Sequence, residues 1–268
     1  MWLLGRFGIC PNGYYNYKKK RKAEAEKQKS RVLRKIERLY HGRMGAVGYR
    51  MMRELLKAEG TCLSKETVRR YMNVELGLKS VTRKRKPGGS TPGKEHKTFE
   101  NLLKGDFSAA QRNQIWCTDF TYLRLADGSF RYNCTIVDLY DRRVVAERCG
   151  KKLDTMLAAQ TLKLGLKKNP AAKGLILHSD QGSPYTSKAF TKYCKRKKLV
   201  QSMSRAGTPG DNAVMERYFN TLKAELVNQV VYREETELYR AIAEFSYDWY
   251  NEKRPHTYNG GRPPAQVL

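Results

Sequence analysis

The hydrophobic pattern of this chain changes its period near Asn113, and this change limits the folds that are open to it. Before that point apolar residues recur at helical spacing, and after it they follow segments of strand length. Two such segments, QIWCTDFTYLRL and FRYNCTIVDLY, flank the turn pair Asp127-Gly128, so we expect a β-hairpin. A third strand is expected over 144–149, after a turn at Asp141-Arg142.

Helices and strands alternate after this hairpin. We expect a helix over 153–166, a buried strand over 174–179, a helix over 187–198 and a strand over 200–204. Two final helices are expected over 212–227 and 235–251. Three antiparallel strands followed by alternating helices and strands predict an α/β domain.

The spacing of apolar residues in the amino-terminal region predicts three short helices, over 31–42, 48–60 and 65–73. Gly60 suits a helix end, and Ser64 suits the cap of the helix that follows. Two helices with a short turn between them, the second carrying Lys65, Arg69 and Arg70 outward, are typical of a helix-turn-helix. The alternative is a three-helix bundle with a solvated basic face. In the first two helices the apolar residues at helical spacing are Val32, Ile36, Tyr40, Met51, Met52, Leu55 and Leu56, with Leu33 beside the first of them. In the third helix we expect Val68, Tyr71 and Met72 to face inward.

A stretch rich in Gly, Pro, Ser and charge, 80–98, separates these regions and predicts a flexible linker. Its RKRK run (83–86) could also be a nuclear signal, but a linker that contacts DNA needs only these charges. We therefore predict four parts: a basic helical region, a basic linker, an α/β domain, and a carboxy-terminal helix with its tail. Their ranges are 1–79, 80–110, 111–227 and 228–268.

The charge balance favours a polyanionic partner. The chain has 53 basic and 26 acidic residues, a net charge of +27. Residues 1–100 hold 26 of the basic and 9 of the acidic ones, so we expect the amino-terminal part to grip DNA most strongly. No apolar stretch approaches the roughly 18 residues of a membrane span, and MWLLGRFGIC is too short for a signal peptide. We expect a cytoplasmic protein associated with the prokaryotic nucleoid. The six cysteines form no CxxC pair, so a zinc finger is not expected.

Three acidic residues are the candidate catalytic and metal-binding groups. Asp119 lies in WCTDFTYL on the first strand, Asp180 follows a short apolar strand in ILHSDQGSPYTS, and Glu216 lies on an expected helix in GDNAVMERYFNTLKAEL. Carboxylates delivered by two strands and a helix can converge on a pair of Mg²⁺ ions, the arrangement used for in-line phosphoryl transfer on nucleic acid. Spacing alone is weak evidence, because the chain contains 26 acidic residues.

The sequence around each of these acids resembles the DDE transposases. The chain is most similar to the downstream-frame product of the insertion sequence three family, relatives of retroviral integrases. The segment GYRMMRELLKAEGTCLSKETVRRYM also resembles the helix-turn-helix of that family. The resemblance implies a ribonuclease H-like integrase catalytic core. It also implies that Asp119 bridges two Mg²⁺ ions, that Asp180 holds one and Glu216 the other, and that Mn²⁺ is a substitute.

Other polar residues near these blocks have weaker signals. Lys223 lies seven residues after Glu216, hence on the same helix face, and integrase relatives place a basic residue there against DNA. Asn212 and Asn220 could approach the DNA backbone. The segment IVDLYDRR, which contains Asp138, resembles a recurring sheet segment of the family. Asp138 is therefore excluded as a metal ligand. His178 could act as a base, but we expect it to pack or to orient the loop.

The family resemblance implies an enzyme that nicks the end of an insertion sequence and joins the freed 3′-OH to another DNA phosphate, through a circular intermediate. Its DNA partners would be terminal inverted repeats and target DNA. We expect a homo-oligomer on DNA, with an upstream-frame product as a possible partner, because no zipper-like heptad run is present in this sequence. Two alternatives remain open: an inert, transposase-derived DNA-binding regulator, and a ribonuclease H-like structure-specific nuclease without strand transfer.

Overall fold

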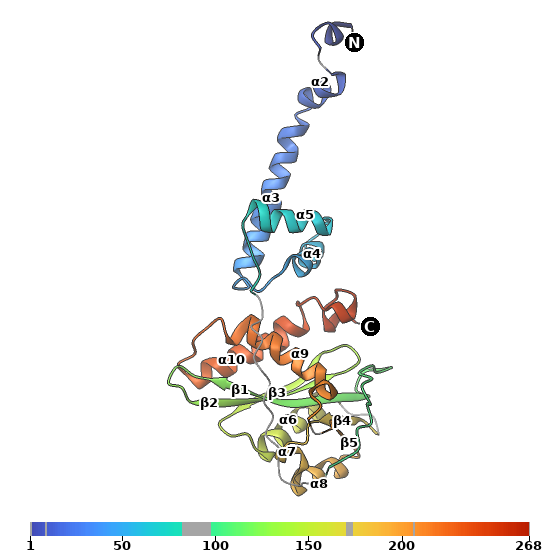
Figure 1. Ribbon diagram of the computed structural model, residues 1–268, viewed down its shortest axis with the longest axis vertical. Coiled ribbons are helices and arrows are strands. Elements are labelled where there is room, and N and C mark those ends of the chain that lie inside the picture. Colours follow the sequence, from blue (N-terminus) through green and yellow to red (C-terminus); the bar gives the residue numbers. More distant parts are fainter. Residues whose placement is uncertain (1, 9, 82–97, 170–173, 206, 268) are drawn as a thin grey trace. The chain divides into compact units, whose positions relative to one another are not determined.

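The computed structural model describes residues 2–8, 10–81, 98–169, 174–205 and 207–267. The chain divides into two compact units, 1–81 and 82–268 (Figure 1), which are described separately. Of the linker predicted over 80–110, residues 82–97 lie outside the described residues. No described helix has both the length and the apolar content needed to cross a membrane.

The first unit is helical. Its elements are α1 (Trp2–Arg6), α2 (Pro11–Lys18), α3 (Arg21–His41), α4 (Tyr49–Ala58), α5 (Lys65–Arg70) and a π-helical turn, η1 (Tyr71–Glu75). The predicted helix signals are confirmed: Gly60 has φ +75° just beyond α4, and the Ser64 hydroxyl accepts the N–H of Thr67 at 3.1 Å. The buried core contains Ile36, Val47, Met52, Leu56, Val68 and Met72.

The second unit is built on a five-stranded sheet in the order β3-β2-β1-β4-β5. Its strands are β1 (Ile115–Arg124), β2 (Phe130–Asp138), β3 (Val144–Gly150), β4 (Ile176–Ser179) and β5 (Val200–Met203). β1, β2 and β3 pair antiparallel, whereas β4 runs parallel to β1 and β5 runs parallel to β4. The predicted α/β fold class is confirmed, and the hairpin turns where expected, with Gly128 at φ +84°.

Helices cover both faces of this sheet (Figure 1). One face carries α6 (Thr155–Lys168), α7 (Ser183–Thr186) and α8 (Lys188–Arg196) over a core that includes Trp116, Leu162 and Phe190. The other face carries α9 (Ala213–Leu222) and α10 (Glu235–Glu244), which continue into the π-helical turns η3 (Lys223–Val227) and η4 (Phe245–Asn251). Short 3-10 turns η2 (Pro209–Asn212), η5 (Thr257–Asn259) and η6 (Pro264–Gln266) complete the unit.

Two side chains fasten the last segments to this framework. The Asn251 side chain accepts the N–H of Val144 at 2.9 Å and donates to its carbonyl at 3.0 Å, in the manner of a strand partner. Arg254 donates to the Glu225 carboxylate at 2.7 and 3.0 Å, and both side chains are largely buried. A buried pair with this fork geometry holds η3, and hence the end of α9, against the tail.

Residues 98–110, part of the stretch predicted as a linker, pack within the second unit. Phe99 packs on the core under α8, Leu103 is buried, and the N–H of Leu102 donates to the Ser202 hydroxyl at 2.9 Å. The physical reason is that this end of the stretch contains large apolar side chains, which gain by leaving water.

Candidate active site

Asp119 lies in the middle of β1, on the sheet face that α9 covers. Its neighbour Thr118 places its hydroxyl 3.1 Å from the Tyr185 hydroxyl, on the α7 side of the sheet. Successive side chains of a strand point to opposite faces, so Asp119 points the other way. Its carboxylate accepts the N–H of Phe120 at 2.7 Å.

Asp180 follows β4 directly, and β4 pairs with β1 over the residues just before Asp119. The Asp180 carboxylate accepts the N–H of Gly182 at 3.0 Å, which turns it back over its own loop. A Cβ atom on Gly182 would lie 2.9 Å from that carboxylate oxygen, closer than real contacts allow. A side chain at this position would therefore displace the end of the Asp180 side chain, which glycine leaves in place.

Glu216 is an exposed residue in the first turn of α9, and Lys223 follows at the end of that helix. The helix stays α-helical from Ala213 to Leu222, so the two residues lie about two turns apart on one side.

The charges of Asp180, Glu216 and Lys223 all act on Asp119. Burial raises the pKa of Asp119 from 3.8 to about 8, and the negative charge of Asp180 and then that of Glu216 add to this effect. The N–H of Phe120 and the Lys223 ammonium act in the opposite direction. Loss of water also raises the pKa of Asp180 and of Glu216, although both residues keep exposed surface.

The donor set suits a hard divalent cation, because carboxylate oxygens are the ligands that Mg²⁺ prefers and a cation would relieve their mutual repulsion. In the described ranges, no three His, Cys, Asp or Glu side chains lie close enough together to hold a metal ion as they stand. Carboxylates that repel one another are expected to be splayed or partly protonated, and the raised pKa of Asp119 agrees with this.

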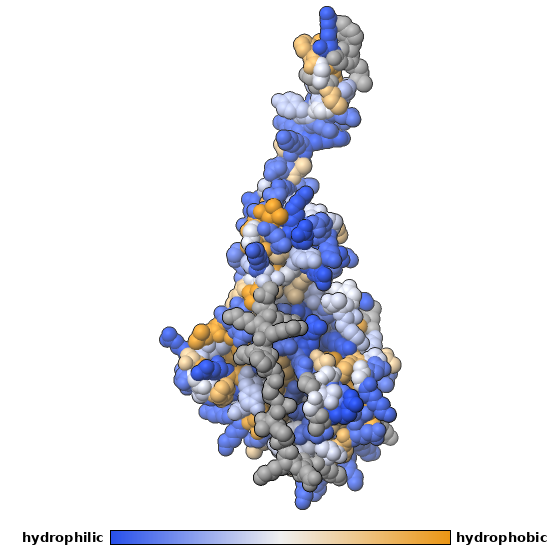
Figure 2. Space-filling model, in the orientation of Figure 1, coloured by the Kyte–Doolittle hydropathy of each residue, from blue (hydrophilic) through white to orange (hydrophobic). Residues whose placement is uncertain are grey.

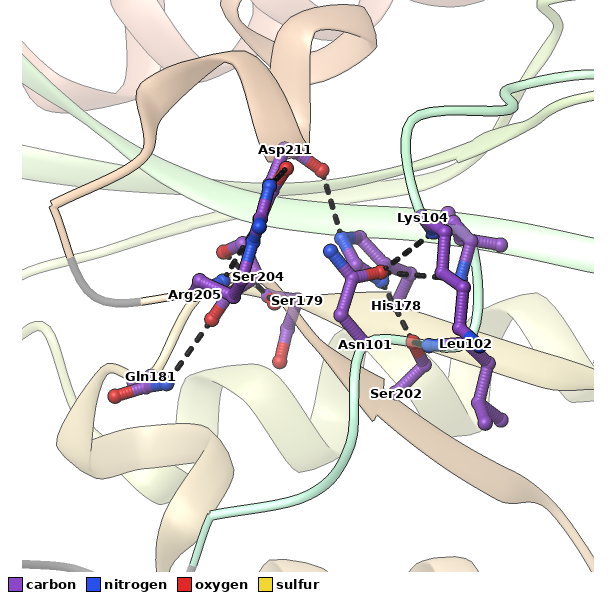
Figure 3. A network of polar contacts seen from close by, with 11 residues as sticks. Asn101, Leu102, Lys104, His178, Ser179, Gln181, Ser202, Ser204, Arg205 and Asp211 are labelled. Atoms are coloured by element: carbon purple, nitrogen blue, oxygen red, sulfur yellow. Dashed lines mark hydrogen bonds and ion pairs between the residues drawn. The ribbon is translucent and has the colours of Figure 1, made fainter.

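His178 does not have the environment of a catalytic base. Its ring is completely buried and both nitrogens have partners (Figure 3): Nε2 lies 2.8 Å from the Asp211 carbonyl, and Nδ1 lies 2.9 Å from the Ser202 hydroxyl. Burial lowers the pKa of the imidazole. The expected packing and orienting role therefore fits the structure.

Asp211 and Asn212 form the segment that leads into α9. The Asp211 carboxylate accepts the backbone N–H of Arg205 and its guanidinium, each at 3.0 Å, which lowers the pKa of Asp211 to about 2. The Asn212 amide donates to the Thr118 carbonyl at 3.4 Å, which places it next to Asp119. Asn220 is exposed on α9, and no DNA contact is assigned to it.

Asp138 belongs to the structural framework. It is completely buried at the end of β2, where its carboxylate accepts the N–H groups of Asn113 at 2.7 Å and Tyr140 at 2.9 Å. These bonds hold the turn after β2, so the carboxylate has no role in the group around Asp119.

Three residues around His178 and the start of α9 could not be selected from the sequence: Ser202, Asp211 and Arg205. The only available signal was that Asp211 precedes the expected helix of Glu216, where an acidic residue usually caps the helix rather than binding an arginine. Ser202 and Arg205 gave no signal, because their roles depend on how β5 lies beside β4.

Three of the basic residues predicted for DNA binding belong to α5 of the first unit. Lys65, Arg69 and Arg70 are all exposed, as expected. Arg69 donates to Glu66 at 3.0 Å, and the Arg70 guanidinium lies 5.7 Å from the ring centre of Tyr71. On the face drawn in Figure 2 hydrophilic residues predominate, and the apolar patches are small and scattered.

Comparisons with known proteins identify both units. Residues 109–209 and 197–264 match two models described as integrase core domains, and residues 27–86 match an HTH-like domain. The chain resembles a simian T-cell lymphotropic virus intasome structure with a TM-score of 0.50 at 15% identity, covering 80% of this chain and 69% of that chain. This likeness supports the ribonuclease H-like, integrase-core fold.

Two bacterial relatives match along almost the whole chain. The putative transposase InsK for insertion sequence element IS150 of Escherichia coli is 31% identical over 251 residues, which cover 94% of this chain and 87% of that protein. The transposase for insertion sequence element IS629 of Shigella sonnei is 30% identical over 271 residues, which cover 99% and 90%. The chain therefore belongs to the insertion sequence three family of transposases, polynucleotidyl transferases that cleave and join DNA strands through an integrase catalytic core.

Proposed function

We propose that Asp119, Asp180 and Glu216 are the catalytic carboxylates of this transposase and bind two Mg²⁺ ions, with Mn²⁺ as a substitute. The observation that carries this proposal is the parallel pairing of β4 with β1, which ends two residues before Asp180 and Asp119, and the raised pKa of Asp119 agrees with it. Perturbed carboxyl groups that share one site are typical of catalytic centres.

The reaction cuts an insertion-sequence end and joins the freed 3′-OH to a phosphate of target DNA. When bound, divalent ions would neutralise the charge of the scissile phosphate and activate the attacking oxygen. The three carboxylates hold them, and Lys223 contacts a DNA phosphate beside the site, which positions the reacting end.

The partners follow from the charge and from the helical unit. Lys65, Arg69 and Arg70 contact DNA, which includes terminal inverted repeats and target DNA. The protein acts as a homo-oligomer on nucleoid DNA in the cytoplasm, alone or with an upstream-frame product. The concentration of positive charge in residues 1–100 supports this division of roles.

The test is Asp180→Asn, which removes one charged ligand while the side chain keeps its shape. We expect loss of Mg²⁺-dependent cleavage and joining with DNA affinity largely unchanged, because the basic surface still binds phosphates. Asp248→Asn is the matched control, since Asp248 is an exposed carboxylate on η4 of the same unit. Joining by Asp180→Asn at the rate of the control would reject Asp180 as a ligand.

The same assays separate the other two functions. An inert regulator would bind DNA without nicking it in either variant. A structure-specific nuclease would cut junctions or hybrids without preferring inverted-repeat ends and would leave no joined product.

A further inference from the structure

Figure 3 shows a buried side chain that connects two of the segments carrying the proposed ligands. His178 lies on β4, two residues before Asp180, and its Nε2 lies 2.8 Å from the carbonyl of Asp211. Asp211 lies two residues before α9, the helix that carries Glu216. One hydrogen bond therefore joins β4, which precedes Asp180, to the segment that precedes the helix of Glu216.

The partners of the ring fix its tautomer. A carbonyl oxygen only accepts, so Nε2 carries the proton and donates to Asp211. Nδ1 is then an acceptor, and the Ser202 hydroxyl donates to it at 2.9 Å. The Ser202 oxygen in turn accepts the N–H of Leu102 at 2.9 Å, which aims its proton at His178.

Further bonds hold the segment of Asp211 and Asn212. Arg205, just beyond β5, binds the Asp211 carboxylate, and Asn212 donates to the Thr118 carbonyl on β1. Among these contacts, the one from His178 alone ties the segment to β4. Glu216 itself is exposed, so its position depends on where α9 begins.

We propose that His178 is a positioning residue, which sets the separation of Asp180 and Glu216 by fastening the start of α9 to β4. The inference rests on the proposed function, because it assumes that the two carboxylates bind metal together. A partner that orients a ligand from outside the coordination shell contributes about 10- to 100-fold to metal affinity or activity in other metal sites.

Two amide substitutions distinguish the bond to Asp211 from simple packing. In His178→Gln the amide nitrogen reaches the position of Nε2 and keeps a donor for the Asp211 carbonyl. In His178→Asn the shorter amide takes the place of Nδ1, keeps contact with Ser202 and leaves that carbonyl without its donor. Neither variant adds charge, and both are polar.

We expect the glutamine variant to retain Mn²⁺ affinity and joining close to the wild type. The asparagine variant should lose about 10-fold or more in both, with KM for DNA unchanged. Mn²⁺ affinity is measured by calorimetry on the full chain without DNA, and melting temperatures record the stability of each variant. Equal Mn²⁺ affinities in two folded variants would overturn the proposal, and so would losses that only follow melting temperature.

A double-mutant cycle shows whether His178 acts through Glu216. If Glu216→Gln weakens Mn²⁺ binding and His178→Asn weakens it no further in that background, the two residues act on one ligand position. Additive losses would overturn the positioning role. If Glu216→Gln leaves Mn²⁺ affinity and joining unchanged, the proposed function itself fails, an outcome distinct from failure of the positioning role.

Discussion

Gly182 shows how one residue without a side chain shapes the site. Its φ of −58° is open to any residue, so the need for glycine comes from the Asp180 carboxylate 2.9 Å from where a Cβ would lie. We predict that Gly182→Ala displaces this carboxylate and lowers joining and Mn²⁺ affinity, while the melting temperature changes little because the backbone is not strained.

The matched control for this change is Gly210→Ala. Gly210 has no atom within 4 Å of its Cβ position and no positive φ. Joining by the two alanine variants, measured on pre-cleaved ends, should differ clearly. A loss of the same size in both would show that the contact between Gly182 and Asp180 has no special role.

The raised pKa of Asp119 predicts that the stability of the metal-free protein depends on pH. Its pKa is raised from 3.8 to about 8, so between these values the folded protein holds a proton that the unfolded chain has released. The stabilisation from this group is complete below the unfolded pKa and is lost as pH rises through the folded one. Asp119→Asn is neutral throughout, so its melting temperature relative to wild type should increase from pH 4 to pH 8, measured with a chelator present.

A flat difference between Asp119→Asn and wild type over this range would contradict the prediction. It would mean that the Asp119 carboxyl group ionises in the folded protein as it does in the unfolded chain.

At the residue scale, Asp119, Asp180 and Glu216 could be selected from the sequence because each lies in a recognisable block, and their catalytic role stays a prediction. The charges of Asp180 and Glu216 both contribute to the raised pKa of Asp119. The contacts of His178 could not be predicted, because they join β4 to β5 and to the turn before α9. Such contacts depend on strand order, which spacing along the chain does not encode.

At the scale of elements, the helix of Glu216 departs from the regular geometry expected over 212–227. It is α-helical to Leu222 and then forms the π-helical turn η3, which begins at Lys223. Such turns are frequent at functional sites. The sequence predicted the length of the helix but not this turn, because an extra residue in one turn leaves the apolar spacing almost unchanged.

Lys223 is the first residue of η3, directly after α9. Its charge lowers the pKa of Asp119. We predict that Lys223→Ala weakens joining of pre-cleaved ends more than it weakens DNA binding. One phosphate contact among many contributes little affinity but positions the reacting end. Lys223→Arg should be partly tolerated, because a cation of similar reach remains. Equal joining rates in all three proteins would show that Lys223 is only a solvated charge.

At the scale of the whole molecule, we expect the first unit to bind DNA and the second to carry out catalysis. The first unit has its own core, and its excess of positive charge should release counterions on binding. We predict that a fragment of residues 1–81 binds DNA with an affinity that falls steeply with salt concentration. Arg69→Ala and Arg70→Ala should reduce both affinity and sequence preference, as measured by competition between end and random DNA.

Arg31→Ala is the control, since Arg31 is an exposed arginine of α3 rather than of α5. It should reduce affinity equally for both DNAs. Unchanged affinity and preference in the two α5 variants would contradict the helix-turn-helix role of that helix. The predicted domain boundaries remain predictions, because composition marks a polar stretch but not which of its residues pack on a neighbouring unit, as Phe99 and Leu103 do.

The bond between Glu225 and Arg254 has a consequence for the time at which the enzyme becomes active. The ribosome makes Glu225 soon after Glu216, but its partner follows 29 residues later. At about 5–20 residues per second this is a delay of seconds, during which α9 and η3 lack the anchor that holds them to the tail. A chain that ends before Arg254 would therefore carry Asp119, Asp180 and Glu216 while α9 and η3 lack this anchor.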